Sequence, residues 1–136
     1  METENLNGTL VLIRPDLEND PAKGQGKVAF IKYVPQQMEG IYVSLLNGQE
    51  AFYKPDELLR LKDKNELFRG LMDNGTSLDV NDFKALYKIS LLQDKGTSTA
   101  LVQALEIARD NPSVWPRALD SLAPEQNLEL AKSYSR

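Results

Sequence analysis

The spacing of apolar residues along the chain changes near Lys62. Before this position, short apolar runs such as residues 9–13 alternate with turn residues, which is typical of β-strands. After it, apolar residues recur every three or four positions, which is typical of amphipathic helices. The pattern therefore predicts an α+β protein, with a β module over residues 1–62 and a helical bundle over residues 63–136 that packs against it.

Five strands are predicted in the first module. Their expected ranges are 8–14, 27–34, 41–46, 49–53 and 58–61. Asn47-Gly48 separates the third and fourth strands and favours a tight hairpin, because both residues tolerate a positive φ angle. Residues 55–58 are expected to form a single helical turn before the closing strand.

This order of elements resembles the SH3-like small β-barrels of the KOW and Tudor kind. The shared features are a buried strand, a long loop with Gly24 and Gly26, two strands joined by Asn47-Gly48, and the run Pro55-Asp56-Glu57-Leu58-Leu59-x-Leu61. The resemblance covers roughly residues 6–62 and implies a five-stranded barrel. Such barrels bind peptides, RNA or methylated side chains, so the resemblance leaves the ligand open.

Four or five helices are predicted in the second module. The first covers residues 63–72, with Leu67, Phe68 and Leu71 facing inward. Thr76 is expected to cap the second helix, whose apolar residues cover much of its circumference and predict a central position. The remaining helices are expected as one opened by Thr97, a short one carrying Val114, Ala118 and Leu122, and a last one starting at Pro124.

The stretch Pro112-x-Val114-x-x-x-Ala118-x-x-x-Leu122 looks like part of a HEAT-type repeat. Trp115 stands where that pattern usually has an arginine, and the chain has no second copy at a matching offset. Because solenoids need several stacked repeats, we interpret the segment as antiparallel helix pairing. Trp115 is expected to anchor the two modules, or two protomers, to each other.

Composition narrows the chemistry that this chain can perform. The formal net charge is −4, and neither module has the basic excess typical of a nucleic-acid-binding surface. The chain has no cysteine, which excludes disulfides, thiolate zinc sites and cysteine nucleophiles. It also has no histidine, the usual general base and the commonest metal ligand. We therefore expect a non-catalytic protein that carries no cofactor.

The N-terminus and the hydropathy of the chain predict its location. The first residues are acidic and lack the apolar core of a signal peptide. No apolar run is long enough to span a bilayer. These features predict a cytoplasmic protein with no membrane partner.

Asp16, Glu18 and Asp20 cluster in the first predicted loop. Neighbouring carboxylates can transfer protons or hold a hard cation. With no histidine and no apolar pocket nearby, a solvated loop is the favoured interpretation. A carboxylate- or metal-dependent enzyme is therefore the last of three functional hypotheses.

Four aromatic residues lie on neighbouring predicted strands around the hairpin: Tyr33, Tyr42, Phe52 and Tyr53. Exposed aromatic side chains on small barrels stack on bases, grip proline-rich segments or cage methylated amines. Strand alternation places Tyr42 opposite the Ile41 face and so predicts that Tyr42 is exposed, whereas Tyr33 fits either face. The structural alternative is that two of the four fill the barrel and the others form cross-strand pairs.

The favoured function is an adaptor that binds a protein or peptide partner through this aromatic part of the barrel, with Trp115 as a further candidate contact. The alternative is an RNA- or ribosome-associated KOW-like factor. It requires four lysines to gather on one face: Lys23, Lys27, Lys32 and Lys54. Binding through lysines would fall steeply with salt, whereas binding through aromatic rings would depend on salt only weakly. The sequence does not indicate the partner or the oligomeric state.

Overall fold

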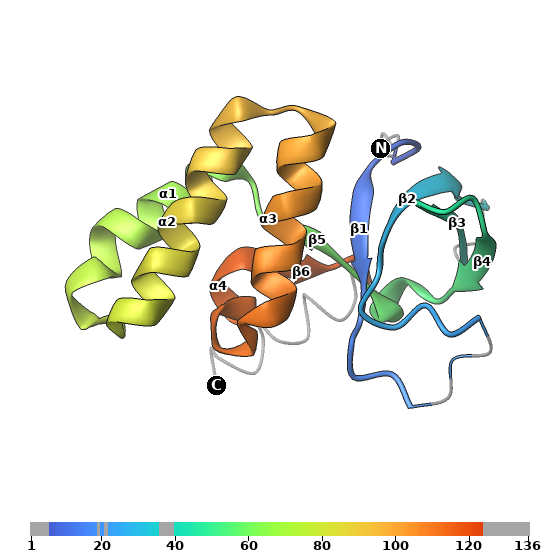
Figure 1. The fold of residues 1–136 in the computed structure, drawn as a ribbon, viewed down its shortest axis with the longest axis horizontal. Helices are drawn as coiled ribbons and strands as arrows, with labels where there is room; N and C mark the ends of the chain where they lie inside the picture. Colours follow the sequence, from blue (N-terminus) through green and yellow to red (C-terminus); the bar gives the residue numbers. More distant parts are fainter. Residues whose placement is uncertain (1–5, 19, 21, 36–39, 124–136) are drawn as a thin grey trace. The chain divides into compact units, whose positions relative to one another are not determined.

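The computed structural model describes residues 6–18, 20, 22–35 and 40–123 (Figure 1). They form an antiparallel sheet followed by helices, which confirms the predicted α+β class. The chain divides into two units: one runs up to Leu59 and resumes at Ser121, and the other is Arg60–Asp120. No helix in the described ranges is long and apolar enough to cross a membrane.

The sheet has six strands in the order β4-β3-β2-β1-β5-β6. Their bounds are β1 (Leu10–Ile13), β2 (Val28–Tyr33), β3 (Ile41–Leu45), β4 (Glu50–Tyr53), β5 (Leu58–Leu61) and β6 (Leu119–Ser121). The first five strands agree with the predicted ranges. A 3₁₀ turn, Pro55–Glu57, precedes β5 at the place where a single helical turn was expected.

The sheet is not closed into a barrel. β1 pairs with both β2 and β5, so the first strand lies next to the last of the five predicted strands. Among the described residues, however, the outer strand β4 pairs with β3 alone. The closed five-stranded barrel that the resemblance implies is therefore replaced here by an open sheet.

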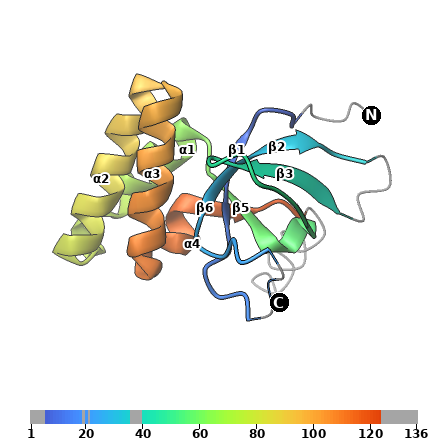
Figure 2. The same cartoon turned by 45° about the vertical axis from the view of Figure 1, so that its right-hand side comes forward.

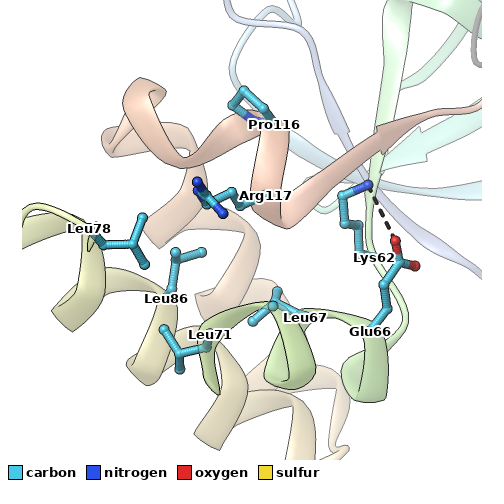
Figure 3. Close-up of a pocket in the computed structure, with 9 residues that line it drawn as sticks. Lys62, Glu66, Leu67, Leu71, Leu78, Leu86, Pro116 and Arg117 are labelled. Carbon is cyan, nitrogen blue, oxygen red and sulfur yellow. Dashed lines mark ion pairs between the residues drawn. The ribbon is translucent and has the colours of Figure 1, made fainter. Parts of the chain in front are cut away.

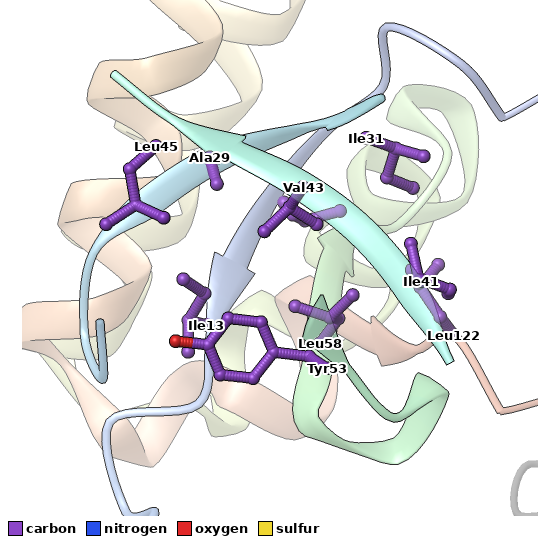
Figure 4. Packing of buried hydrophobic residues seen from close by; sticks show 10 residues of the cluster. Ile13, Ala29, Ile31, Ile41, Val43, Leu45, Tyr53, Leu58 and Leu122 are labelled. Carbon is purple, nitrogen blue, oxygen red and sulfur yellow. The ribbon is translucent and has the colours of Figure 1, made fainter. Parts of the chain in front are cut away.

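One side of the sheet carries the core of the first unit (Figure 4). Its buried side chains come from β1 to β5 and from the segment after β6: Val11, Ile13, Ala29, Ile31, Ile41, Val43, Leu45, Tyr53, Leu58 and Leu122. Leu12, which points to the opposite side of β1, is also fully buried. Both faces of β1 are therefore buried between Val11 and Ile13.

The hairpin between β3 and β4 is longer than predicted. The amide of Gly48 donates to the carbonyl of Leu45. Of the two turn residues Asn47 and Gly48, only Gly48 has a positive φ angle, of 94°. The side chain of Asn47 accepts instead from the amide of Gln49. Such local side-chain hydrogen bonding is a further reason why asparagine favours turns. Asn47-Gly48 thus marks the turn correctly, but the connection is not a two-residue loop.

Four α-helices follow the first five strands: α1 (Lys64–Asn74), α2 (Val80–Lys95), α3 (Ser98–Asp110) and α4 (Trp115–Ala118). Asp63, Asp79 and Thr97 cap the first three by accepting hydrogen bonds from amides of the first turn. Thr76, the predicted cap of α2, instead lies in a 3₁₀ turn, and Asp79 takes that role. α2 packs against both α1 and α3, and Figure 2 shows α2 beside α3.

Three helical predictions need correction or fall outside the described part. Phe68 was expected to face inward but is 47% exposed, whereas Leu67 and Leu71 are buried as predicted. The helix expected to carry Val114 to Leu122 ends at Ala118, because Leu119 is extended and begins β6. Apolar residues four positions apart lie on one face of a helix. In a strand, residues an even number of positions apart also point to the same face, so the spacing alone does not distinguish the two. The helix predicted from Pro124 lies outside the described residues.

Candidate functional site

Three of the predicted aromatic residues lie together on the outer side of the sheet, opposite the core. Tyr33, Tyr42 and Phe52 are 56%, 45% and 50% exposed, and we call them the aromatic face. Tyr42 is paired with Phe52 across β3 and β4, and their ring centroids are 4.6 Å apart. The rings of Tyr33 and Tyr42 lie 6.2 Å apart in a tilted arrangement. The three rings therefore form a continuous row across three strands.

A register shift in β2 brings Tyr33 onto this face. Ile31 pairs with Val43 and points into the core, and simple alternation would send Tyr33 to the same side. Instead, Tyr33 pairs with Tyr42, so β2 has one extra residue, Lys32, at this point. Such an irregularity redirects the side chains that follow it. The sequence pattern does not show this extra residue, so alternation alone could not place Tyr33.

Phe52 covers a glycine at the start of β3. A Cβ atom placed on Gly40 would lie 1.9 Å from Cζ of Phe52, so the ring occupies the space that a side chain would need. Gly40 is buried although it stands at the end of a strand. An aromatic ring over a glycine protects its backbone from water. The sequence signal for this contact was a glycine beside a strand, which often marks a close approach.

A charged pair stands near the aromatic face. Nζ of Lys32 lies 2.5 Å from Oε2 of Glu50, and both side chains are about half exposed or more. Glu50 pairs with Ser44 of β3. Glu50 and Phe52 are two positions apart on β4, so their side chains point to the same side of the strand. Exposed ion pairs contribute little to stability, about 0–1 kcal/mol. The pair mainly neutralises the charge beside the rings.

Tyr53, the fourth predicted aromatic residue, belongs to the core and not to this face. It is only 4% exposed, and its hydroxyl donates a 2.8 Å hydrogen bond to Oδ2 of Asp20. Burial, and then the hydrogen bond to Asp20, raise the pKa of Tyr53 well above its ordinary value. Tyr53 therefore stays protonated and serves as a donor that ties the first loop to the core.

Asp20 organises that loop through three hydrogen bonds. Besides the Tyr53 hydroxyl, its carboxylate accepts from the amides of Ala22 and Gly24, at 3.0 and 2.8 Å. A Cβ atom on Gly24 would lie 2.6 Å from the Tyr53 hydroxyl oxygen, so this position needs a glycine. The loop between β1 and β2 is thus held by a buried polar contact.

The predicted carboxylate cluster does not converge on a metal site. Asp16 forms a salt bridge with Arg14, 3.1 Å between Oδ1 and Nε, which lowers the pKa of Asp16. Glu18 is exposed. The Asp20 carboxylate already accepts three hydrogen bonds within the protein. Within the described ranges, no three carboxylates or other metal-ligating side chains gather.

The four lysines of the nucleic-acid hypothesis are spread over the sheet unit. Lys23 and Lys27 flank the turn before β2, and Lys54 follows β4. Lys32 lies about 16 Å further along β2 than Lys27, from the rise of about 3.3 Å per strand residue. Its charge is also paired with Glu50. The charge of Lys32 is therefore already compensated within the sheet unit.

Trp115 lies in the helical unit and is half buried. Its indole Nε1 donates a 2.7 Å hydrogen bond to the carbonyl of Ala108, near the end of α3. This bond holds the start of α4 against α3. The contact is internal to the helical unit, so it does not place Trp115 with the aromatic face.

Comparison of the chain with protein-family models, curated proteins and solved structures gives no match.

Proposed function

We propose that the sheet unit is an SH3-like module and that the protein is a non-catalytic adaptor. The pairing of β1 with both β2 and β5 supports the first part, as does the 3₁₀ turn Pro55–Glu57 that leads into β5. In this proposal the aromatic face of Tyr33, Tyr42 and Phe52 binds an extended segment of a protein or peptide partner.

The observation that carries the proposal is the contiguity of the three exposed rings. Single exposed apolar side chains are ordinary on a protein surface, but adjacent aromatic side chains are enriched at binding sites. Here the rings stand on three neighbouring strands. The ring of Phe52 lies over Gly40, and Tyr42 is the cross-strand partner of both Tyr33 and Phe52. A rigid row of rings loses little entropy when a ligand covers it.

The surroundings of the face favour a partner that is held by apolar contact. Lys32 and Glu50 beside the face are paired with each other, so the charge of Lys32 is already compensated and less available to a phosphate backbone. Ring faces and edges grip proline and other apolar side chains of an extended peptide. We therefore expect binding that changes little between low and high salt.

Selection of peptides from a displayed random library tests this proposal. The full-length protein and a Tyr33→Ser/Tyr42→Ser variant would be immobilised side by side. We expect the wild-type protein to enrich peptides with a shared apolar or proline-containing motif, and the double variant to lose that enrichment. Tyr87→Ser is the matched control, because Tyr87 is 46% exposed but lies on α2, in the other unit.

Two results would count against the proposal. One is the absence of any enriched motif on the wild-type protein, or equal enrichment on the double variant. The other is retention of nucleic acid that is lost as salt is raised, because lysine-phosphate contacts are strongly salt-dependent and ring contacts are not. That second result would support nucleic-acid binding through the lysines instead.

A further inference from the structure

The helical unit contains a hollow that takes no part in the proposed adaptor function (Figure 3). Its volume is about 300 Å³, at the lower end of the range for small-molecule sites. Four leucines from α1, α2 and the turn between them line it: Leu67, Leu71, Leu78 and Leu86. Leu78 is the most exposed of them, because the other three are only 2–3% exposed. Lys62, Glu66 and Arg117 stand around it as charged groups. All of these residues belong to one unit, Arg60–Asp120.

Gly70 keeps one side of this hollow open. It lies in the interior of α1, where glycine costs about 0.5–1 kcal/mol relative to alanine. Its φ angle is not positive, so no unusual backbone conformation requires a glycine. Outside its own helix and neighbours, a Cβ atom on Gly70 would meet no heavy atom of the described chain within 4 Å. The missing side chain therefore leaves free space instead of making room for a neighbour.

The two cations beside the hollow differ in their partners. Nζ of Lys62 lies 2.6 Å from Oδ1 of Asp120 and 3.7 Å from Oε2 of Glu66, so its charge is already compensated. Arg117 has no ion-pair partner in the part of the chain that the structure describes. Figure 3 shows its guanidinium directed toward Leu78 and Leu86. Arg117 is thus the cation that is available to an incoming anion.

We propose that the hollow binds an aliphatic carboxylate. The alkyl chain would lie against the four leucines, and the carboxylate would accept hydrogen bonds from the Arg117 guanidinium, which matches it in a planar, two-pronged geometry. Burying the chain removes apolar surface from water, while the head group stays at the exposed arginine. Glu66 disfavours a second negative charge, so a monocarboxylate fits better than a dicarboxylate.

Two sources could supply this chemistry, a free aliphatic acid or the C-terminal leucine of a peptide. Titration with octanoate tests the first, and titration with a short peptide that ends in leucine tests the second. Trp115 is the single tryptophan of the chain and directly precedes the lining residues Pro116 and Arg117, so its fluorescence reports binding. A rise in melting temperature with ligand concentration gives an independent readout.

We expect octanoate, with ten non-hydrogen atoms, to bind with a Kd on the order of 1 mM. Octylamine, which carries the opposite charge on a similar chain, should not bind. A peptide that ends in a free leucine carboxylate should bind better than its amidated form if the source is a chain terminus. Binding of octylamine or of the amide equal to that of the matching acid would overturn the proposal, as would a failure of both acids to bind.

Two variants address the two halves of the site. Gly70→Leu fills the hollow and should abolish binding, whereas Gly70→Ala adds a single methyl group and controls for the change in helix propensity. Arg117→Gln should weaken binding about tenfold by removing a charge-assisted hydrogen bond. Arg69→Gln is its control, because Arg69 is an exposed arginine of α1 that does not line the hollow. Full binding by Gly70→Leu or by Arg117→Gln would overturn the assignment.

Discussion

The glycine at the aromatic face of the sheet unit and the glycine at the hollow of the helical unit serve opposite purposes. In the sheet unit, the space beside Gly24 holds the Tyr53 hydroxyl, and the space beside Gly40 holds the ring of Phe52. In the helical unit, the space beside Gly70 is empty of heavy atoms from the rest of the described chain. Gly40 thus lets an aromatic ring pack against the backbone at the aromatic face, whereas Gly70 leaves space open at the hollow.

This difference bears on how each unit could bind a partner. The sheet unit presents a row of exposed rings, in which Tyr42 lies next to both Tyr33 and Phe52, and Phe52 lies over Gly40. A ligand would lie on it. The helical unit presents an opening lined by leucines, into which a ligand would insert. Substitutions at the glycines and at their neighbours can therefore test the comparison directly.

The largest effect is expected at Gly24. In Gly24→Ala, the new methyl group would lie 2.6 Å from the Tyr53 hydroxyl oxygen and 3.1 Å from Cδ1 of Ile13, and both of these side chains are buried. Overpacking of this kind costs about 1–3 kcal/mol. Urea denaturation should show a loss in that range. An unchanged midpoint would mean that the loop does not pack as described.

Tyr53→Phe should have the next largest effect. It removes the hydrogen bond to the Asp20 carboxylate but leaves the two amide donors of that carboxylate in place. A hydrogen bond to a charged group contributes about 1.5–3 kcal/mol, and the remaining donors reduce the loss to about 1–2 kcal/mol. Urea denaturation at neutral pH measures it, and Tyr33→Phe, at an exposed tyrosine, is the control.

Tyr53→Phe also tests how the stability of the protein depends on pH. The pKa of Tyr53 is raised in the folded protein above its ordinary value of 10.0. Above that pH the unfolded chain loses the proton that the folded protein keeps, so the free energy of unfolding falls as pH rises. The stabilisation by Tyr53 is complete below pH 10 and declines above it. The difference in stability between wild type and Tyr53→Phe should therefore narrow from pH 9 to pH 11; a constant difference would contradict the buried hydrogen bond.

Gly40→Ala should lower the free energy of unfolding by about 1 kcal/mol, because Phe52 can move outward but then loses its contacts with Tyr42 and the glycine. The displaced ring should weaken the near-ultraviolet circular dichroism of the aromatic face. Retention of both the stability and the aromatic signal would show that Phe52 does not cover Gly40.

Gly70→Ala should have the smallest effect, and of the opposite sign. Alanine has open space at this position and a better helix propensity, so the variant should gain about 0.5–1 kcal/mol in urea denaturation. A destabilised variant would mean that the space beside Gly70 is filled, and would remove the contrast with Gly40.

The sequence predicted the elements better than their details. The five strands followed from alternating apolar residues, and the start of a helix at Thr97 from its position before an apolar helical stripe. Asp63 was expected inside the first helix but caps it. The side of Tyr33 could not be predicted, because it depends on a register shift that arises from pairing with β3. Nor could β6, since a strand of three residues carries too few positions to show a period.

The candidate site was likewise visible only in part. The aromatic residues stood out because they lie on neighbouring strands, and alternation along β4 places Tyr53 on the opposite side from Phe52. The hydrogen bond from Tyr53 to Asp20, 33 positions earlier, could not be predicted. The hollow was not predicted, because its lining joins Lys62 to Arg117 across most of the helical unit. Gly70, inside a helical pattern, was the one local signal for it.

The most direct test of the account is the affinity of the full-length protein for a peptide that the wild type selects. It would be measured by titration for the wild type, Tyr42→Ser and Tyr87→Ser, which change two tyrosines of nearly equal exposure, 45% and 46%. We predict that Tyr42→Ser weakens binding by about tenfold or more, as expected for a central aromatic contact, and that Tyr87→Ser leaves it unchanged. Equal affinities for all three proteins, or a loss confined to Tyr87→Ser, would contradict the assignment of the aromatic face as the binding surface.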